Sequence, residues 1–135
     1  MKLTLLTPEK KIVMNQEVDE VLVPGHHGEL DILPGHAPLM TLLSTGTLRW
    51  RLKGASELNQ VVVSWGYCEV NPEGVIVLAE SSLNAQDVQA EAFKNEIKGL
   101  ETKLGADELN DEQWNEAQRR LAELKSALDL PAART

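Results

Sequence analysis

The chain has 135 residues, with 21 acidic and 13 basic side chains and a formal net charge of −8. Because contacts to phosphate need a basic stripe, this charge argues against a nucleic-acid-binding surface. No apolar run reaches the roughly 18 residues of a membrane-spanning helix. The single cysteine, Cys68, cannot form an intrachain disulfide, which fits a reducing compartment. These totals indicate one domain, or a small domain with an appendage.

The first 84 residues have the pattern of a β-sandwich. Short apolar runs alternate with turn residues, and in residues 47–53 apolar and basic side chains alternate with a period of two. The predicted strands are residues 2–6, 11–14, 17–23, 29–33, 39–43, 47–53, 60–65, 67–70 and 75–79. Gly66 is expected to form a kink or bulge between two of them. About nine to ten short strands at regular spacing predict an antiparallel sandwich or barrel.

A segment rich in glycine, proline and histidine, Gly25 to Pro38, interrupts these strands. Glycine admits positive φ and proline fixes φ near −65°, so this density of both predicts sharp, rigid backbone turns. The residues expected to form a structural corner are Gly28, Pro34, Gly35 and Pro38.

Residues 85–135 change to helical spacing. Apolar residues recur every three or four positions from Gln86 to Gly105, and Asn84 with Asp87 resembles a cap. A second helix is predicted to begin at Asn110, with Gln113 at the capping-box position, and to end at Pro131. The sequence therefore predicts an α+β chain: a sandwich over residues 1–84 and an antiparallel two-helix hairpin over residues 85–135.

The apolar stripe of each predicted helix is narrow. A hairpin of this length buries too little surface to be firmly stable alone, so it must dock on the sandwich or on another protein. Two interpretations stay open. The hairpin is either a packing appendage or a movable arm whose docked and undocked states differ by a few kcal/mol.

The sequence offers only weak candidates for catalytic or metal-binding residues. His26, His27 and His36 lie near Glu29 and Asp31, a set that superficially suggests a cupin-like metal site. However, adjacent His26 and His27 would point to opposite faces of an extended strand, and they lie beside glycine, which favours a solvated turn. The sequence contains no G-x-S-x-G elbow and no glycine-rich phosphate loop. The residues thus favour a chain that is not an enzyme.

Two segments, GELDILPGHAPLMTLLSTGTLRW and GYCEVNPEGVIVLAESS, resemble the fingerprint of the epsilon subunit of bacterial F-type ATP synthase. The resemblance covers the whole chain, sandwich and hairpin alike. It implies a non-catalytic central-stalk subunit that couples the gamma subunit to the membrane ring of c subunits during proton-driven ATP synthesis. It also implies helices that can inhibit ATP hydrolysis, and a peripheral position on the cytoplasmic face of the bacterial plasma membrane.

The resemblance also suggests which residues contact partners. Glu29 and His36 occupy family positions that face the c-ring loops, and Asp31 adds a carboxylate where the family usually has glycine. As an alternative, His36 holds its own turn through a ring hydrogen bond. On the second helix, basic side chains are expected to meet acidic surface on the alpha and beta subunits; these are Arg119, Arg120 and Lys125.

Two further departures from the family pattern matter. Trp65 stands where the first glycine of a pair is usual, so the packing around it must differ. Some members bind ATP through an aspartate and an arginine early in the first helix, and Gln89 and Ala92 stand at those positions here. We therefore expect ATP binding to be weak or absent, and no cofactor. A cupin-like metalloenzyme and a free-standing adaptor are the competing interpretations.

Overall fold

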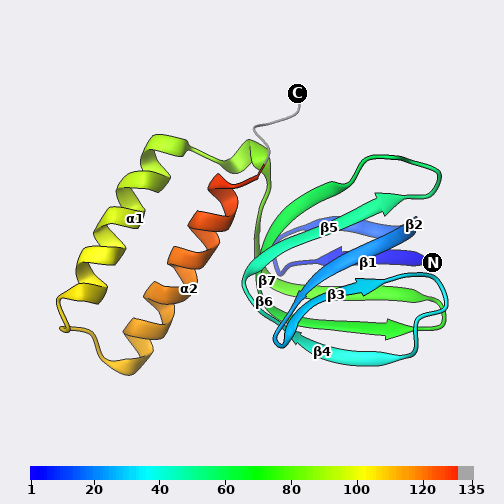
Figure 1. Ribbon diagram of the computed structural model, residues 1–135, viewed down its shortest axis with the longest axis horizontal. Coiled ribbons are helices and arrows are strands. Elements are labelled where there is room, and N and C mark those ends of the chain that lie inside the picture. Colours follow the sequence, from blue (N-terminus) through cyan, green and yellow to red (C-terminus); the bar gives the residue numbers. More distant parts are fainter. Residues whose placement is uncertain (131–135) are drawn as a thin grey trace.

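The computed structural model describes residues 1–130 and places a seven-stranded sandwich beside a two-helix hairpin (Figure 1). The strands are β1 (Lys2–Leu6), β2 (Lys11–Gly25), β3 (Gly28–Ile32), β4 (Leu39–Leu43), β5 (Gly46–Leu52), β6 (Asn59–Asn71) and β7 (Gly74–Leu83). They are followed by a 3₁₀ turn, η1 (Ala85–Asp87), and by the helices α1 (Ala90–Gly105) and α2 (Asp111–Leu128). The predicted α+β class, a sandwich followed by a helical hairpin, is confirmed.

The strands form one sheet that closes on itself. Its order is β1-β7-β6-β4-β2-β3, with β5 paired to β2 and β6, and β1 paired to β2 as well as to β7. All pairings are antiparallel except that of β1 with β7, which runs parallel from Lys2↔Gly74 to Leu6↔Leu78. The first and last strands of the sandwich are therefore neighbours, a pairing that the expected antiparallel pattern did not include.

Seven strands replace the nine expected because two predicted breaks are bends inside continuous strands. Asn15, with φ 53°, bends β2 where two strands had been expected. In β6, Trp65 and Gly66 have φ values of 57° and 137°, and the strand continues through them. The predicted kink at Gly66 is confirmed, and its physical basis is visible: a Cβ there would lie 1.8 Å from the Leu78 carbonyl oxygen.

The bend at Trp65 and Gly66 reverses which side chains face inward. Before the bend, Val61 and Val63 belong to the main core and Val62 packs against the hairpin. After it, Cys68 and Val70 face the core. The partner strand β7 changes in the same place, because Ala79 is in the main core whereas Leu83 packs with Val62. One end of this pair of strands therefore presents its outer face to the hairpin.

Both predicted caps are present. Asn84 accepts from the backbone N–H of Gln86 and Asp87, but it caps the short η1 turn, and α1 begins later, at Ala90. Asn110 accepts from the backbone N–H of Gln113, whose side chain accepts from Asn110 in return. This reciprocal bonding satisfies two donors at the start of α2. Pro131, the predicted end of the helix, lies outside the described residues.

The hairpin docks through a small apolar cluster. Val62 and Leu83 of the sandwich pack there with Phe93 of α1 and with Leu124 and Ala127 of α2. Among residues 1–130, the main sandwich core, from Leu3 to Ala79, contains no residue of the hairpin. None of the helices within residues 1–130 is long and apolar enough to cross a membrane.

Candidate functional site

Two acidic residues singled out from the sequence lie side by side on an edge strand. Glu29 and Asp31 are two positions apart on β3, both exposed, and they pair with Pro24 and Leu22 of β2. β3 stands at the end of the strand order, so its outer backbone edge is open. Charges on such an edge discourage pairing with other strands. The two carboxylates thus form one negatively charged edge.

His36 lies in the loop of residues 33–38 that follows β3, at the end of the sandwich away from the hairpin (Figure 1). Its ring Nδ1 is 2.7 Å from the Ala37 carbonyl oxygen, and its backbone N–H donates to Leu33 O. A carbonyl only accepts, so Nδ1 donates its proton in this contact. The ring therefore holds its own turn while one nitrogen stays available.

The expected corner is divided between the two ends of β3. Pro34, Gly35 and Pro38 belong to the loop that carries His36, and Gly35 has φ 86°. Gly28, with φ 123°, closes the two-residue turn between β2 and β3, at the end nearer the hairpin (Figure 1). His26 and His27 form that turn, exposed, with ring centroids 5.1 Å apart.

An apolar outer face crosses four strands and was not identified from the sequence. Met40 and Leu42 of β4 are 66% and 63% exposed, and Tyr67 of β6 is 38% exposed. The register places Leu42, Tyr67, Leu78 and Leu6 in one row across β4, β6, β7 and β1. The neighbouring row runs from Met40 through Glu69 to Ile76, so one carboxylate interrupts it. We call Leu6, Met40, Leu42, Tyr67, Ile76 and Leu78 the outer apolar face. Exposed apolar surface of this kind marks a protein–protein contact.

The sequence did contain a signal for this face. LMTLL of β4 and VIVLA of β7 are apolar at nearly every position rather than at every second one. Near-continuous apolar strands are typical of sheets covered on both faces. Within residues 1–130, the hairpin packs on the Val62 end of β6 and β7, and Met40 and Leu42 on the outer face stay largely exposed.

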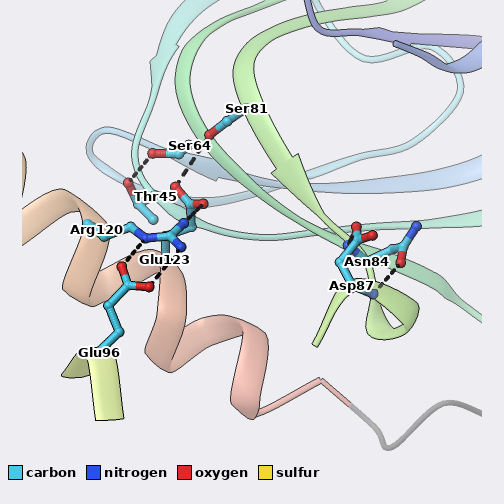
Figure 2. Close-up of polar contacts among 8 residues, drawn as sticks. All are labelled: Thr45, Ser64, Ser81, Asn84, Asp87, Glu96, Arg120 and Glu123. Atoms are coloured by element: carbon cyan, nitrogen blue, oxygen red, sulfur yellow. Dashed lines mark hydrogen bonds and ion pairs between the residues drawn. The ribbon is translucent and has the colours of Figure 1, made fainter. Parts of the chain in front are cut away.

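Polar side chains join the two helices to each other and to β7 (Figure 2). Arg120 of α2 donates to both carboxylate oxygens of Glu96 in α1, at 2.6 and 3.2 Å, and to Glu123 at 3.0 Å. Glu123, which is only 8% exposed, also accepts from Ser81. The hydrogen bond from Arg120 lowers the pKa of Glu96, and the same bond raises the pKa of Arg120. Arg120 is thus occupied within the hairpin.

Arg119, the next residue of α2, contacts the sandwich instead. Its guanidinium lies 3.8 Å from the centroid of the Trp65 ring, and Nη1 is 3.6 Å from Glu80 Oε2. Trp65 therefore has a specific partner on the hairpin. Of the three basic residues expected to meet other subunits, Arg119 and Arg120 have intramolecular partners, and Lys125 is exposed.

Two side chains with potentially reactive groups, Ser64 and Cys68, are buried in the sandwich. Ser64 is buried and its hydroxyl lies 2.9 Å from that of Thr45. Burial, helped by the nearby Glu69 carboxylate, raises the pKa of the Cys68 thiol to about 12. Among residues 1–130 the structure has no group of three His, Cys, Asp or Glu side chains arranged to hold a metal ion.

A closed sandwich with an exposed apolar face and a docked helical hairpin is the architecture of a subunit that contacts other chains in a complex. Residues 1–85 match the family model described as the ATP synthase delta/epsilon chain, beta-sandwich domain. The chain belongs to the ATP synthase epsilon-chain family.

Curated relatives of this chain are also epsilon chains of ATP synthase. The chain is 46% identical over 129 residues to the ATP synthase epsilon chain of Bdellovibrio bacteriovorus, covering 96% of this chain and 92% of that protein. It is 40% identical over 104 residues to the epsilon chain of Citrifermentans bemidjiense, covering 77% of this chain and 73% of the relative.

Solved structures show the same fold. A chain in the cryo-EM structure of the Euglena gracilis mitochondrial ATP synthase matches with a TM-score of 0.80 at 20% identity, covering 93% of this chain and 78% of that one. A chain in the central stalk and c-ring structure of the Tetrahymena thermophila mitochondrial enzyme matches with a TM-score of 0.63 at 15% identity, covering 94% and 96%.

Proposed function

We propose that this chain is a non-catalytic central-stalk subunit of a bacterial F-type ATP synthase, in which the sandwich links the gamma subunit to the c ring during proton-driven ATP synthesis. The complex would hold it peripherally on the cytoplasmic face of the plasma membrane. The observation that carries the proposal is the outer apolar face, whose residues Met40 and Leu42 are largely exposed. In a member of the epsilon-chain family, a rigid sandwich with such a face suits a rotor part.

The outer apolar face is the proposed contact with gamma. A charge introduced on the β4 part of this face would have to be buried without a partner on assembly, which is costly. The variants Met40→Glu and Leu42→Glu are expected to lower the affinity for epsilon-depleted ATP synthase at least about tenfold, or ~1.4 kcal/mol. Titration of the depleted complex with labelled chain measures this affinity.

Met14→Glu is the matched control. Met14 is 51% exposed on β2, outside the outer apolar face, and the substitution introduces the same charge. It is expected to bind like the parent chain. Equal binding by Met14→Glu and Met40→Glu, both folded, would place the gamma contact elsewhere.

Glu29, Asp31 and His36 are the proposed contacts with the polar loops of the c ring. The two carboxylates share one open sheet edge, and His36 keeps Nε2 available. Interfacial charges of this kind act mainly on orientation and specificity. Cysteines replacing Glu29 and His36 are expected to crosslink to cysteines in the c loop, and the buried native Cys68 should not interfere. If neither cysteine crosslinks to the c loop while cysteines at other sandwich positions do, the c-ring contact does not lie at these residues.

Residues 85–135 are the proposed regulatory arm, and residues 1–84 the coupling unit. In this proposal the arm inhibits ATP hydrolysis by extending toward the alpha and beta subunits, with Arg119, Arg120 and Lys125 meeting acidic surface there. Arg119 and Arg120 must first leave their present partners. Deletion of residues 106–135 should then raise the ATPase activity of the reconstituted head. Unchanged activity would mean that the hairpin is a packing appendage and does not regulate hydrolysis.

ATP is not expected to control this arm. Gln89 and Ala92, both exposed, carry neither the carboxylate nor the guanidinium that would anchor a nucleotide. A ligand shifts such an equilibrium only by its differential affinity for the two states. Calorimetry on the isolated chain is expected to give no dissociation constant below ~0.1 mM, which corresponds to about −5.5 kcal/mol.

A further inference from the structure

Two neighbouring arginines of α2 serve different contacts. Arg120 binds Glu96 and Glu123, so its bonds lie within the hairpin. Arg119 binds Trp65 and Glu80, which belong to β6 and β7 of the sandwich. Consecutive helical residues point about 100° apart, so adjacent arginines can face different surfaces. One therefore holds the hairpin together, and the other joins it to the sandwich.

Trp65 and Glu80 stand at the point where β6 and β7 change which side chains face outward. They lie opposite each other, between the paired positions Ser64↔Ser81 and Gly66↔Ala79. Trp65 has φ 57°, a left-handed conformation that a bulky residue rarely adopts. This conformation presents the indole ring to α2. The strained backbone and the Arg119 contact thus occur at the same residue.

The side of the hairpin near Arg119 does not close tightly on the sandwich. An open cavity of about 860 Å³ lies there between α2 and the sandwich, lined by Arg119, Trp65, Thr45 and His26 among others. The apolar cluster around Val62 and Leu124 secures the hairpin elsewhere along the same helix. The contacts of Arg119 with Trp65 and Glu80 join α2 to the sheet beside the cavity, and the hydrogen bond from Ser81 to Glu123 joins them one turn further along α2.

We infer that Arg119, held between Trp65 and Glu80, is a releasable clamp that sets how often the hairpin leaves the sandwich. The clamp is weak enough to open. The Glu80 side chain is 61% exposed and that of Arg119 27%, so water and salt screen their ion pair. The stacking on Trp65 supplies the remaining attraction. The inference concerns the isolated chain and does not depend on the proposed role in ATP synthase.

The test uses a buried thiol as a reporter of undocking. Ala127, 1% exposed in the apolar cluster, becomes accessible only when the hairpin leaves or unfolds, so Ala127→Cys places a thiol there. When opening and closing are fast relative to modification, the labelling rate follows the open population. In this background, Arg119→Gln and Trp65→Gly are each expected to raise the labelling rate about fivefold, or ~1 kcal/mol.

Native Cys68, buried in the main core, reports opening of the sandwich in the same sample, and its labelling rate is expected to stay unchanged. Lys98→Gln, which removes an exposed positive charge from α1, is the matched control and should label at the parent rate. Because both groups act through one contact, the combined Arg119→Gln and Trp65→Gly variant should label no faster than the faster single variant. The clamp would be overturned if Arg119→Gln labelled at the parent rate. It would also be overturned if the increase in labelling rate of the combined variant were the product of the two single increases.

Discussion

At Gly66, a single missing Cβ lets two strands approach. Gly66 has φ 137°, and an added Cβ would lie 1.8 Å from the Leu78 carbonyl oxygen. Gly66→Ala must therefore both strain the backbone and push β6 from β7. We expect a loss of about 3 kcal/mol or more in the free energy of unfolding, measured by urea denaturation.

The variant Gly28→Ala separates the cost of the strained backbone from the cost of the steric clash. Gly28 has a similar φ of 123°, but an added Cβ there would meet nothing within 4 Å. This variant should lose only the backbone term, about 1–3 kcal/mol. If both variants lost the same stability, the close approach to Leu78 would not be what requires glycine at position 66.

Glu96 gives the hairpin a dependence on pH. The hydrogen bond from Arg120 lowers its folded-state pKa below the ordinary value of 4.5. Its contribution to stability is therefore present above about pH 4.5 and is lost as the pH falls through the lowered folded pKa. The Glu96 side chain is 42% exposed, so the contribution is small, on the order of 0.2–1 kcal/mol.

The variant Glu96→Gln should accordingly be less stable than the parent near pH 7, and the difference should vanish at low pH. Denaturation at several pH values measures it. Glu101→Gln, an exposed carboxylate on the same helix, should show no such difference. A gap between Glu96→Gln and the parent that did not change with pH would contradict the electrostatic origin.

At the scale of the elements, α2 depends on the residue that caps its N-terminus. Asn110 and Gln113 form a reciprocal cap. Asn110→Ala leaves the Gln113 backbone N–H without this acceptor and should cost about 1 kcal/mol. Helicity followed by circular dichroism on heating measures the loss. Asn115→Ala, an exposed position inside α2, removes the same side chain without touching the cap and should be at least as stable as the parent.

The caps were predictable because they depend on residues three positions apart. Asn84 with Asp87, and Asn110 with Gln113, are local signals, and both are present. The kink at Gly66 was equally local. By contrast, Asn15 and Gln16 were interpreted as a break, although the pairing of β2 with β1 holds the strand together there. Local composition does not reveal that pairing.

At the scale of the whole molecule, the sandwich and the hairpin have separate cores. Because the main core contains none of the hairpin residues that the structure describes, removing residues 85–135 should spare ion-driven ATP synthesis. Removing residues 1–84 should abolish it, since the proposed contacts with gamma and the c ring go with them. ATP synthesis in membranes carrying each truncated chain measures both outcomes, and equal losses would contradict this division of roles.

Contacts between residues far apart in the sequence could not be predicted from the sequence alone. Arg119 and Trp65 are far apart in sequence, and neither position predicts the other. Arg120 binds Glu123 one turn away on its own helix, and also Glu96 of the other helix, which no local pattern predicts. The row of Leu6, Leu42, Tyr67 and Leu78 likewise exists only once four strands are in register.

The parallel pairing of β1 with β7 also bears on how the chain acquires its fold. Lys2–Leu6 can pair with β2 early, but its second neighbour, Gly74–Leu83, must first be made, so on the ribosome this edge of the sheet stays open until almost the whole sandwich has been synthesised. At roughly 5–20 residues per second, that wait lasts several seconds. Topologies dominated by such non-local pairings also refold slowly, in milliseconds to seconds. During synthesis, Leu3 and Leu5 are therefore apolar side chains that nascent-chain chaperones can bind before the sheet closes.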